Sequence, residues 1–164
     1  MPTMDMIRRI LCPTDFSATA TKAVKYAERL ALQTAADLYL VNAFSTPVEL
    51  TVASQTSPRD SQHQENMNQL LVESPLANRV VRLLHAGEPG EVICWMAQEH
   101  SCDVIIMGTH GHGGLHHLIF GSVAEYVLRH ARCPVMTIRN RPDNEAPATQ
   151  PLVIPVKAPK FISG

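Results

Sequence analysis

One segment of the chain combines glycines, histidines and a serine in a pattern suited to binding phosphate groups. It runs from Gly108 to Ser122, follows an apolar run and precedes a helical pattern. Glycines let the backbone adopt positive φ angles and come close to a ligand. The first turn of the following helix offers unpaired N–H groups and a partial positive charge. The segment therefore predicts an anion site, and a phosphate chain is the ligand that such a site suits best.

The glycine spacing differs from that of the common phosphate-binding loops. The segment contains no G-x-x-x-x-G-K-[ST] and no G-x-G-x-x-G. It has instead G-x-x-G, nine residues, then G-[ST], supplied by Gly108, Gly111, Gly121 and Ser122. In a plainer interpretation the glycines serve only a tight turn and Ser122 only caps the next helix. A capping role for Ser122 is compatible with phosphate binding.

Asp15, which follows the first apolar run, has two interpretations. Its carboxylate can cap the next helix by accepting backbone N–H groups. It can also hold ribose hydroxyls or a Mg²⁺ ion that bridges phosphates, because this hard cation prefers oxygen ligands. Asp15 lies at the carboxyl end of a predicted strand, where ligands bind in parallel sheets, so we favour the ligand role.

The glycine-rich segment also carries four histidines, at His110, His112, His116 and His117. The two glycines between His112 and His116 disfavour a preformed helix, and no acidic or cysteine ligand stands nearby to complete a tetrahedral set. We therefore predict no metal site made by these histidines. Imidazolium charge near phosphates would instead make nucleotide affinity depend on pH.

The elements that must position these residues alternate between short β-rich runs and longer helical patterns. Apolar runs predict five strands, at residues 7–12, 38–43, 80–84, 104–107 and 134–138. Helical spacing predicts a helix from the N-cap Ser17 to about residue 34. Residues 45–61 read as a loop, and further helices are predicted at 62–73, from Pro89 to about 100, and at 122–130.

This alternation predicts a three-layer α/β/α sandwich around a parallel sheet, with ligands at the carboxyl ends of the strands where strand order reverses. The runs at 7–12 and 104–107 are continuously apolar, as strands buried on both faces should be. We expect one domain over residues 1–139. Residues 140–164 are rich in proline and predict a linker and an extended segment that lies along a sheet edge or across a partner chain.

Composition excludes several classes of partner. The net charge of −1, with lysines and arginines scattered along the chain, gives no footprint for nucleic acid. No apolar run approaches the ~20 residues that span a bilayer. The four cysteines are widely spaced and contain no C-x-x-C pair. We therefore expect a cytoplasmic protein with reduced, mostly buried thiols.

The glycine spacing and its surroundings resemble the nucleotide-binding signature of the ATP-binding branch of the universal stress protein family. Residues 103–111 read DVIIMGTHG and residues 121–135 read GSVAEYVLRHARCPV. The PTDFS of residues 13–17 resembles the family's first strand-to-helix turn. The resemblance covers roughly residues 5–139. It implies an adenine-nucleotide alpha-hydrolase-like fold, a five-stranded parallel sheet of order 3-2-1-4-5.

The resemblance also implies which residues contact the nucleotide. The end of the first strand contacts it, a backbone position on the second strand contacts the adenine, the end of the fourth strand lies against base and ribose, and the glycine-rich segment binds the phosphates. The implied residues are Pro13, Thr14, Asp15, Val41, Met107, Gly108, His110, Gly111, His112, Gly113, Gly121, Ser122 and Val123. His112 departs from the family because many relatives carry a larger cation there, and the loop after the second strand is short.

The function implied is that of a stress-response regulator. Such a protein binds ATP, or AMP left after turnover, and signals the occupied state through a homodimer to an unidentified protein partner. Residues 135–138 form an apolar edge suited to pairing two copies through the fifth strand. Two alternatives are a slow ATPase that uses His110 or His112 and a dimeric interaction module without nucleotide. The intact glycine motif disfavours the latter, and the sequence does not separate ATP from AMP.

Overall fold

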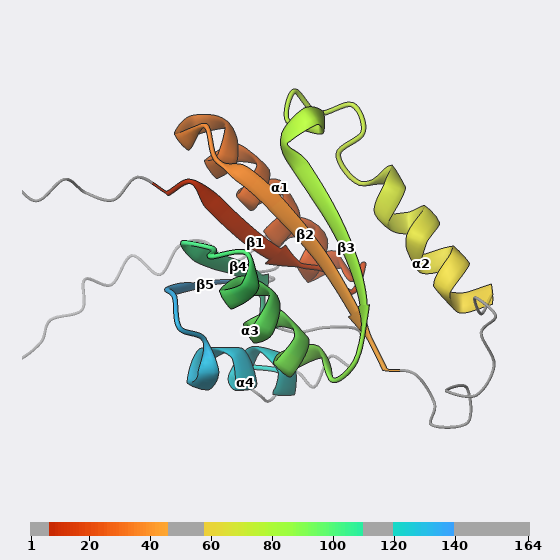
Figure 1. The fold of residues 1–164 in the computed structure, drawn as a ribbon, viewed down its shortest axis with the longest axis vertical. Coiled ribbons are helices and arrows are strands. Elements are labelled where there is room, and N and C mark those ends of the chain that lie inside the picture. Colours follow the sequence, from red (N-terminus) through yellow and green to blue (C-terminus); the bar gives the residue numbers. More distant parts are fainter. Residues whose placement is uncertain (1–6, 46–57, 110–119, 140–164) are drawn as a thin grey trace, which may run out of the picture.

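The computed structural model describes residues 7–45, 58–109 and 120–139, which form a parallel sheet between two layers of helices (Figure 1). The strands are β1 (Arg9–Pro13), β2 (Asp37–Phe44), β3 (Val80–Ala86), β4 (Val104–Gly108) and β5 (Val135–Ile138). All pairings are parallel and the order is β3-β2-β1-β4-β5. The predicted fold class and strand order are therefore confirmed.

Helices cover both faces of this sheet. They are α1 (Ala18–Thr34), α2 (Pro58–Gln69), α3 (Pro89–Glu99) and α4 (Ser122–His130), and a 3₁₀ turn, η2 (Ala77–Arg79), leads into β3. Helices α1 and α2 pack into one core cluster, and α3 and α4 pack into the other (Figure 1). No helix in the described part of the chain is long and apolar enough to cross a membrane.

Most helix ends follow their sequence signals. Ser17 caps α1 as predicted, because its hydroxyl accepts the N–H of Ala20 at 3.2 Å. Pro89 occupies the first turn of α3, and α4 spans the residues expected of it. The prediction for α2 was wrong at both ends. This helix begins at Pro58, inside the segment expected to be a loop, and ends at Gln69. A proline suits a first helical position, whereas the polar helix that follows has no apolar periodicity to mark its length.

The core divides at the sheet because successive side chains of a strand point to opposite faces. Ile10 and Ile106 lie in the cluster covered by α1, and Leu11 and Ile105 lie in the cluster covered by α3 and α4. All four are fully buried, so β1 and β4 are the strands buried on both faces, as predicted. Burial of each such side chain contributes about 1.5–3 kcal/mol to stability.

Strand order reverses between β1 and β4, and we use the word crevice for the region outside the carboxyl ends of these two strands. From β1 the chain passes to β2 and β3 on one side, then crosses to β4 and β5 on the other. The helices that follow these neighbouring strands, α1 after β1 and α4 after β4, therefore cover opposite faces of the sheet (Figure 1). In open parallel sheets the crevice at such a reversal is the place where ligands bind.

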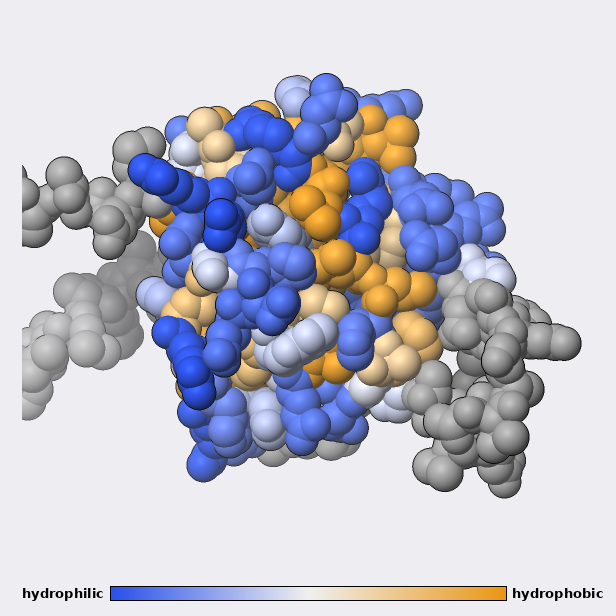
Figure 2. Space-filling model, in the orientation of Figure 1, coloured by the Kyte–Doolittle hydropathy of each residue, from blue (hydrophilic) through white to orange (hydrophobic). Residues whose placement is uncertain are grey.

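The face that carries α3 is mixed in character. Figure 2 shows hydrophobic residues gathered near the middle of this face, among hydrophilic ones. Strand β3 and helix α3 each carry an exposed apolar side chain, Val81 and Trp95 respectively. The Trp95 ring lies 5.1 Å from the ring of His85, so this tryptophan packs against the edge strand.

Candidate functional site

The turn after β1 is held by its own hydrogen bonds. The N–H of Thr14 donates to the carbonyl of Val41 at 2.8 Å, and the Thr14 hydroxyl accepts the N–H of Phe16 at 3.1 Å. Phe16 has a φ of 64°, a left-handed conformation that is uncommon for a side chain of this size. The turn from Pro13 to Ser17 is thus fixed before any ligand arrives.

Asp15 lies on the exposed side of this turn. Its Oδ1 accepts the N–H of Ser17 at 3.0 Å, which is an Asx turn, while Ser17 itself caps α1. The capping interpretation of Asp15 is therefore wrong in its detail: this carboxylate braces the turn and a different residue caps the helix. Its exposed position at the carboxyl end of β1 leaves the side chain accessible from the crevice.

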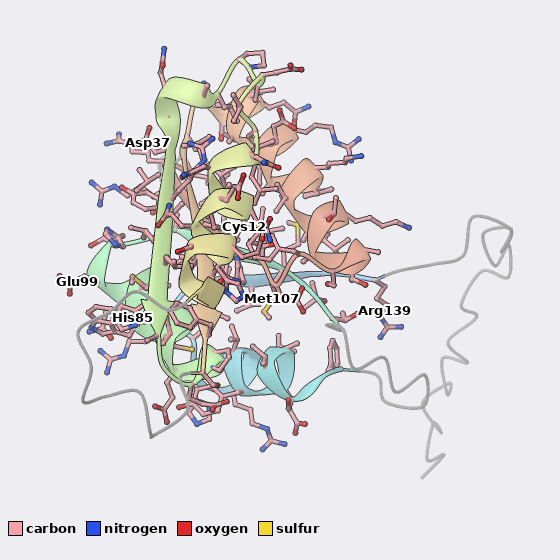
Figure 3. All side chains as sticks on the ribbon, turned by 90° about the vertical axis from the view of Figure 1, so that its right-hand side faces the viewer. Cys12, Asp37, His85, Glu99, Met107 and Arg139 are labelled. Atoms are coloured by element: carbon pink, nitrogen blue, oxygen red, sulfur yellow. The ribbon has the colours of Figure 1, made fainter. Side chains whose placement is uncertain are left out.

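Gly108 ends β4 where α1 comes closest to the sheet. A Cβ atom at this position would lie 2.9 Å from Cγ2 of Thr19 and 3.1 Å from the Thr19 carbonyl carbon. The glycine is therefore required for packing against the first turn of α1. Met107 is buried with 4% of its surface exposed, and its side chain belongs to the core cluster covered by α3 and α4 (Figure 3).

The two ends of the glycine-rich segment meet. The N–H of Gly121 donates to the carbonyl of Thr109 at 2.7 Å, and the N–H of Thr109 donates to the carbonyl of Ile138 at 3.0 Å. Gly121 is the N-cap of α4, Ser122 is its first residue and is exposed, and Val123 follows half-buried. The expectation that Ser122 is the N-cap was wrong by one residue. The first N–H groups of α4 consequently lie beside the end of β4.

Four of the predicted site residues lie outside the described residues: His110, Gly111, His112 and Gly113. The other predicted positions come from three connections. Pro13 ends β1 and is followed by Thr14 and Asp15, Met107 and Gly108 end β4, and the residues from Gly121 onward open α4. Their shared location at the carboxyl ends of adjacent strands brings these groups to one crevice.

Val41 differs from the other predicted contacts. It is fully buried, and its carbonyl already accepts the N–H of Thr14. The pairing of β1 with β2 stops at Pro13 opposite Val41, whereas β2 continues to Phe44 alongside β3. Peptide groups alternate in direction along a strand, so those of Ala43 point to the same side as those of Val41, beyond the end of β1. Sequence reasoning missed Ala43, although the period of two was a usable signal.

Arg139 is a second residue that sequence reasoning missed. It directly follows β5, and its guanidinium carbon lies 5.8 Å from the ring centroid of Phe120, a cation–π contact. Phe120 immediately precedes the N-cap of α4. Arg139 thus adds a positive side chain next to the helix N-terminus, and Figure 3 shows it at the periphery of the molecule. Its distance from the glycine segment in sequence hid this relationship.

Sequence reasoning also missed a third group, Asn42 and His63, which is linked to the turn after β1. Asn42 of β2 is buried, and its Nδ2 donates to the carbonyl of Thr14 at 2.7 Å. Its Oδ1 lies 2.9 Å from Nδ1 of His63, a residue of α2. The polar composition of α2 gave no indication that its His63 side chain contacts Asn42.

Cys12, the cysteine nearest the carboxyl end of β1, has an unreactive thiol. Cys12 is fully buried in β1, and this burial raises the pKa of its thiol far above the usual value. Cys12 is therefore one of the buried thiols that the sequence predicts. All four cysteines are free thiols, as expected, and Cys102 is also buried whereas Cys94 and Cys133 are half-buried.

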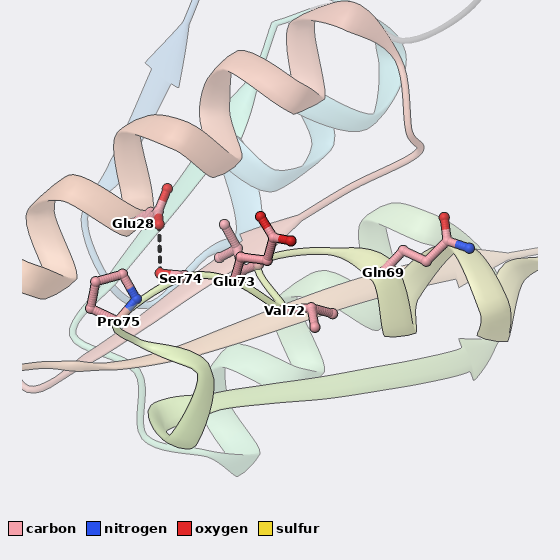
Figure 4. Close-up of a pocket in the computed structure, with 7 residues that line it drawn as sticks. Glu28, Gln69, Val72, Glu73, Ser74 and Pro75 are labelled. Carbon is pink, nitrogen blue, oxygen red and sulfur yellow. Dashed lines mark hydrogen bonds between the residues drawn. The ribbon is translucent and has the colours of Figure 1, made fainter.

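A separate hollow lies between α1 and the segment after α2 (Figure 4). Its lining residues are Glu28, Gln69, Leu71, Val72, Glu73, Ser74 and Pro75. The Ser74 hydroxyl donates to Oε1 of Glu28 at 2.5 Å. The chain passes from this hollow through η2 into the amino end of β3, so the hollow lies away from the carboxyl-end crevice. Its two glutamates would repel phosphate groups.

Comparison with known proteins yields one family. Residues 6–139 match the model of the Universal stress protein family. The Universal stress protein MJ0577 of Methanocaldococcus jannaschii is 27% identical over 157 residues, which cover 83% of this chain and 97% of that protein.

Solved structures give the same answer for the fold. The universal stress protein UspA from Lactobacillus plantarum superposes with a TM-score of 0.70 at 27% identity, over 81% of this chain and 98% of that one. Two more distant structures contain nucleotides. A universal stress protein in complex with cAMP has a TM-score of 0.66 at 18% identity and covers 81% of this chain and 97% of that one. The Archaeoglobus fulgidus protein in complex with dAMP has a TM-score of 0.59 at 22% identity and covers 81% of this chain and 98% of that one.

Proposed function

The chain belongs to the universal stress protein family, and from this premise we propose that it is a regulator that binds an adenine nucleotide at the carboxyl ends of β1 and β4. The observation that carries the proposal is the hydrogen bond from Gly121 to Thr109, 2.7 Å long. It holds the N-terminus of α4 beside the end of β4, the strand that pairs with β1. A helix N-terminus in that position suits phosphate groups, because its N–H groups and dipole favour negative charge.

The phosphate end of the proposed site uses backbone and side-chain donors together. The N–H groups of Gly111, Ser122 and Val123 and the Ser122 hydroxyl would donate to phosphate oxygens. Arg139 would add a positive charge from the end of β5, close to Phe120. Guanidinium groups bind phosphate through several parallel hydrogen bonds, so this residue would favour longer phosphate chains over a monophosphate.

The base and ribose would lie between the ends of β1, β2 and β4. We assign the adenine-contacting backbone to Ala43, because the carbonyl of Val41 is already engaged by Thr14. The backbone of Gly108, at the end of β4, would contact the ribose. Asp15 is an exposed carboxylate suited to ribose hydroxyls or to Mg²⁺. The oxygen chemistry of Asp15 fits this ion, with nucleotide phosphates supplying further ligands.

The regulator would act as a homodimer formed through β5. This strand stands at one edge of the sheet and carries Met136, which is 36% exposed. An uncovered strand edge favours pairing with another strand, and a second copy of β5 satisfies its outward peptide groups. Nucleotide occupancy would then be passed on to a protein that distinguishes the bound from the empty dimer. We place this dimer in the cytoplasm.

The experiment is to denature freshly purified protein and to identify the released small molecules by mass spectrometry. The proposal predicts ATP, ADP or AMP in near-stoichiometric amount, and its loss in the double variant Gly121→Val and Ser122→Ala. The exposed α3 substitution Gln98→Ala serves as the control and should retain the nucleotide. Steady conversion of added ATP to ADP would favour the slow ATPase. Absence of nucleotide, with no change in melting temperature on adding ATP, would favour the interaction module.

A further inference from the structure

A continuous chain of hydrogen bonds joins α2 to the turn after β1. His63 Nδ1 lies 2.9 Å from Oδ1 of Asn42, and Nδ2 of Asn42 donates to the carbonyl of Thr14 at 2.7 Å. Because an amide oxygen only accepts, His63 must carry its proton on Nδ1 and donate it. The three residues come from α2, β2 and the turn, so the bonds link parts of the chain that are remote in sequence.

Asn42 occupies the middle of this chain and has little access to water. Its exposed fraction is 2%, and its two polar atoms are each used, one toward His63 and one toward Thr14. A buried amide that loses a partner leaves a desolvated polar atom, which is costly. The bond from His63 therefore holds the Asn42 amide in the orientation that serves Thr14.

The ring of His63 is fixed by two aromatic neighbours. Its centroid lies 6.0 Å from that of Phe16 and 5.5 Å from that of Phe44, with interplanar angles of 73° and 80°. Both contacts are edge-to-face, an arrangement favoured for aromatic pairs. Phe16 belongs to the turn after β1, and Phe44 ends β2 next to Ala43. His63 thus touches both segments to which we assign contacts with the base and ribose.

We propose that His63 is a positioning residue for the nucleotide site, acting through Asn42 on the carbonyl of Thr14. This inference rests on the proposed function. The carbonyl of Thr14 belongs to the peptide group that leads into Asp15, so fixing it sets the direction from which the Asp15 carboxylate faces the crevice. His63 itself contacts no ligand in this arrangement. The site is complete only when α2 is docked against β2.

The test is a set of ATP titrations by calorimetry on the full chain. His63→Phe keeps a ring between Phe16 and Phe44 but removes the N–H donor. We expect it to bind ATP roughly fivefold more weakly, the effect of about one net hydrogen bond. Asn42→Ala should weaken binding at least as much, and the double variant should bind no more weakly than Asn42→Ala alone, because the two act in series. His63→Gln, which restores an N–H donor, should recover most of the affinity.

Glu65→Ala, an exposed position on the same helix, is the matched control and should bind ATP like the wild type. Urea unfolding of every variant separates a loss of folding from a loss of positioning. Wild-type affinity in His63→Phe, or additive losses in the double variant, would overturn the inference while leaving the proposed function intact. If the wild-type chain binds no adenine nucleotide, the proposed function fails, and the positioning role fails with it.

Discussion

The carbonyl of Thr109 accepts the N–H of Gly121 at 2.7 Å, so the end of β4 and the N-cap of α4 are in direct contact. Twelve positions separate these residues in the sequence. The N–H of Thr109 in turn is bonded to Ile138 at the end of β5. The start of α4 is therefore anchored to the sheet at its carboxyl edge, and this anchoring places the first N–H groups of α4, the proposed phosphate donors, beside the end of β4.

Gly108→Ala should destabilise the fold. Its Cβ would stand 2.9 Å from Thr19 Cγ2 and 3.1 Å from backbone of the same residue, and the backbone contact has no flexible atom to yield. We expect a loss of about 1–3 kcal/mol in the free energy of unfolding, the usual effect of overpacking, measured by urea denaturation. Gly121→Ala is the control, because the φ of −73° at Gly121 suits any residue. Equal stability of Gly108→Ala and the wild type would contradict the close packing of α1 on β4.

Arg139→Gln should weaken ATP binding more than AMP binding. The guanidinium stands beside the α4 N-terminus, so its charge acts on the outer phosphates of a longer chain. We expect roughly a fivefold loss for ATP at low salt, corresponding to about 1 kcal/mol for an exposed charge pair, and a smaller loss at high salt. Titration calorimetry at two salt concentrations measures it. Arg132→Gln, an exposed change of the same charge, should leave both affinities unaltered. Equal losses for ATP and AMP would remove Arg139 from the phosphate site.

Thr137→Pro should dissociate the proposed dimer without unfolding the protomer. The carbonyls of Pro134 and Ile138 bond to β4, so the peptide groups of Thr137, by alternation, point out from the sheet edge. Proline at an edge position removes the outward donor and spares the bonds to β4. Analytical ultracentrifugation should show a dimer for the wild type and for Thr137→Ala, and a monomer for Thr137→Pro. A dimer that tolerates proline here would mean that the interface lies elsewhere.

The stability of the protein should fall at alkaline pH partly through Cys102. Burial, with smaller contributions from Cys133 and Asp103, raises the pKa of the Cys102 thiol from its ordinary 9.0 to about 12. Between these values the unfolded chain loses the proton while the folded chain keeps it. Stability is therefore fully present below about pH 9 and declines as pH rises toward about 12. Urea unfolding across this range should show a steeper decline for the wild type than for Cys102→Ala. Parallel curves would contradict this account of the buried thiol.

Much of the fold could be predicted from short patterns because those patterns reflect burial. The continuous apolar runs in β1 and β4 correspond to strands with helices on both faces, and Ser17 marks the start of α1 through its side-chain bond. The ends of α2 could not be predicted. Met67 is its one buried residue among the described side chains, so tertiary contact and not periodicity sets where the helix lies.

In the candidate site, too, the residues with local sequence signals could be predicted and those placed by long-range contacts could not. Local signals placed Asp15 and Gly108 at the carboxyl ends of strands and Gly121 directly before a helix, and the family resemblance added Thr14. The period of two shows that Ala43 points to the same side as Val41, but only the sheet register shows that the pairing of β1 with β2 ends at Val41, and for this reason Ala43 was missed. Arg139 contacts Phe120 and His63 contacts Asn42 from segments that carry no motif, and only the packing of β5 and α2 brings these pairs together. Long-range contacts of this kind leave no spacing in the sequence to recognise.

The most direct test of nucleotide binding is titration calorimetry of ligand-free protein with ATP, run beside the double variant Gly121→Val and Ser122→Ala. The account predicts saturable binding of one nucleotide per chain by the wild type and a large loss of affinity in the variant, with both proteins folded by circular dichroism. Absence of binding by the folded wild type, or equal binding by the two proteins, would contradict the assignment of the α4 N-terminus as the phosphate site.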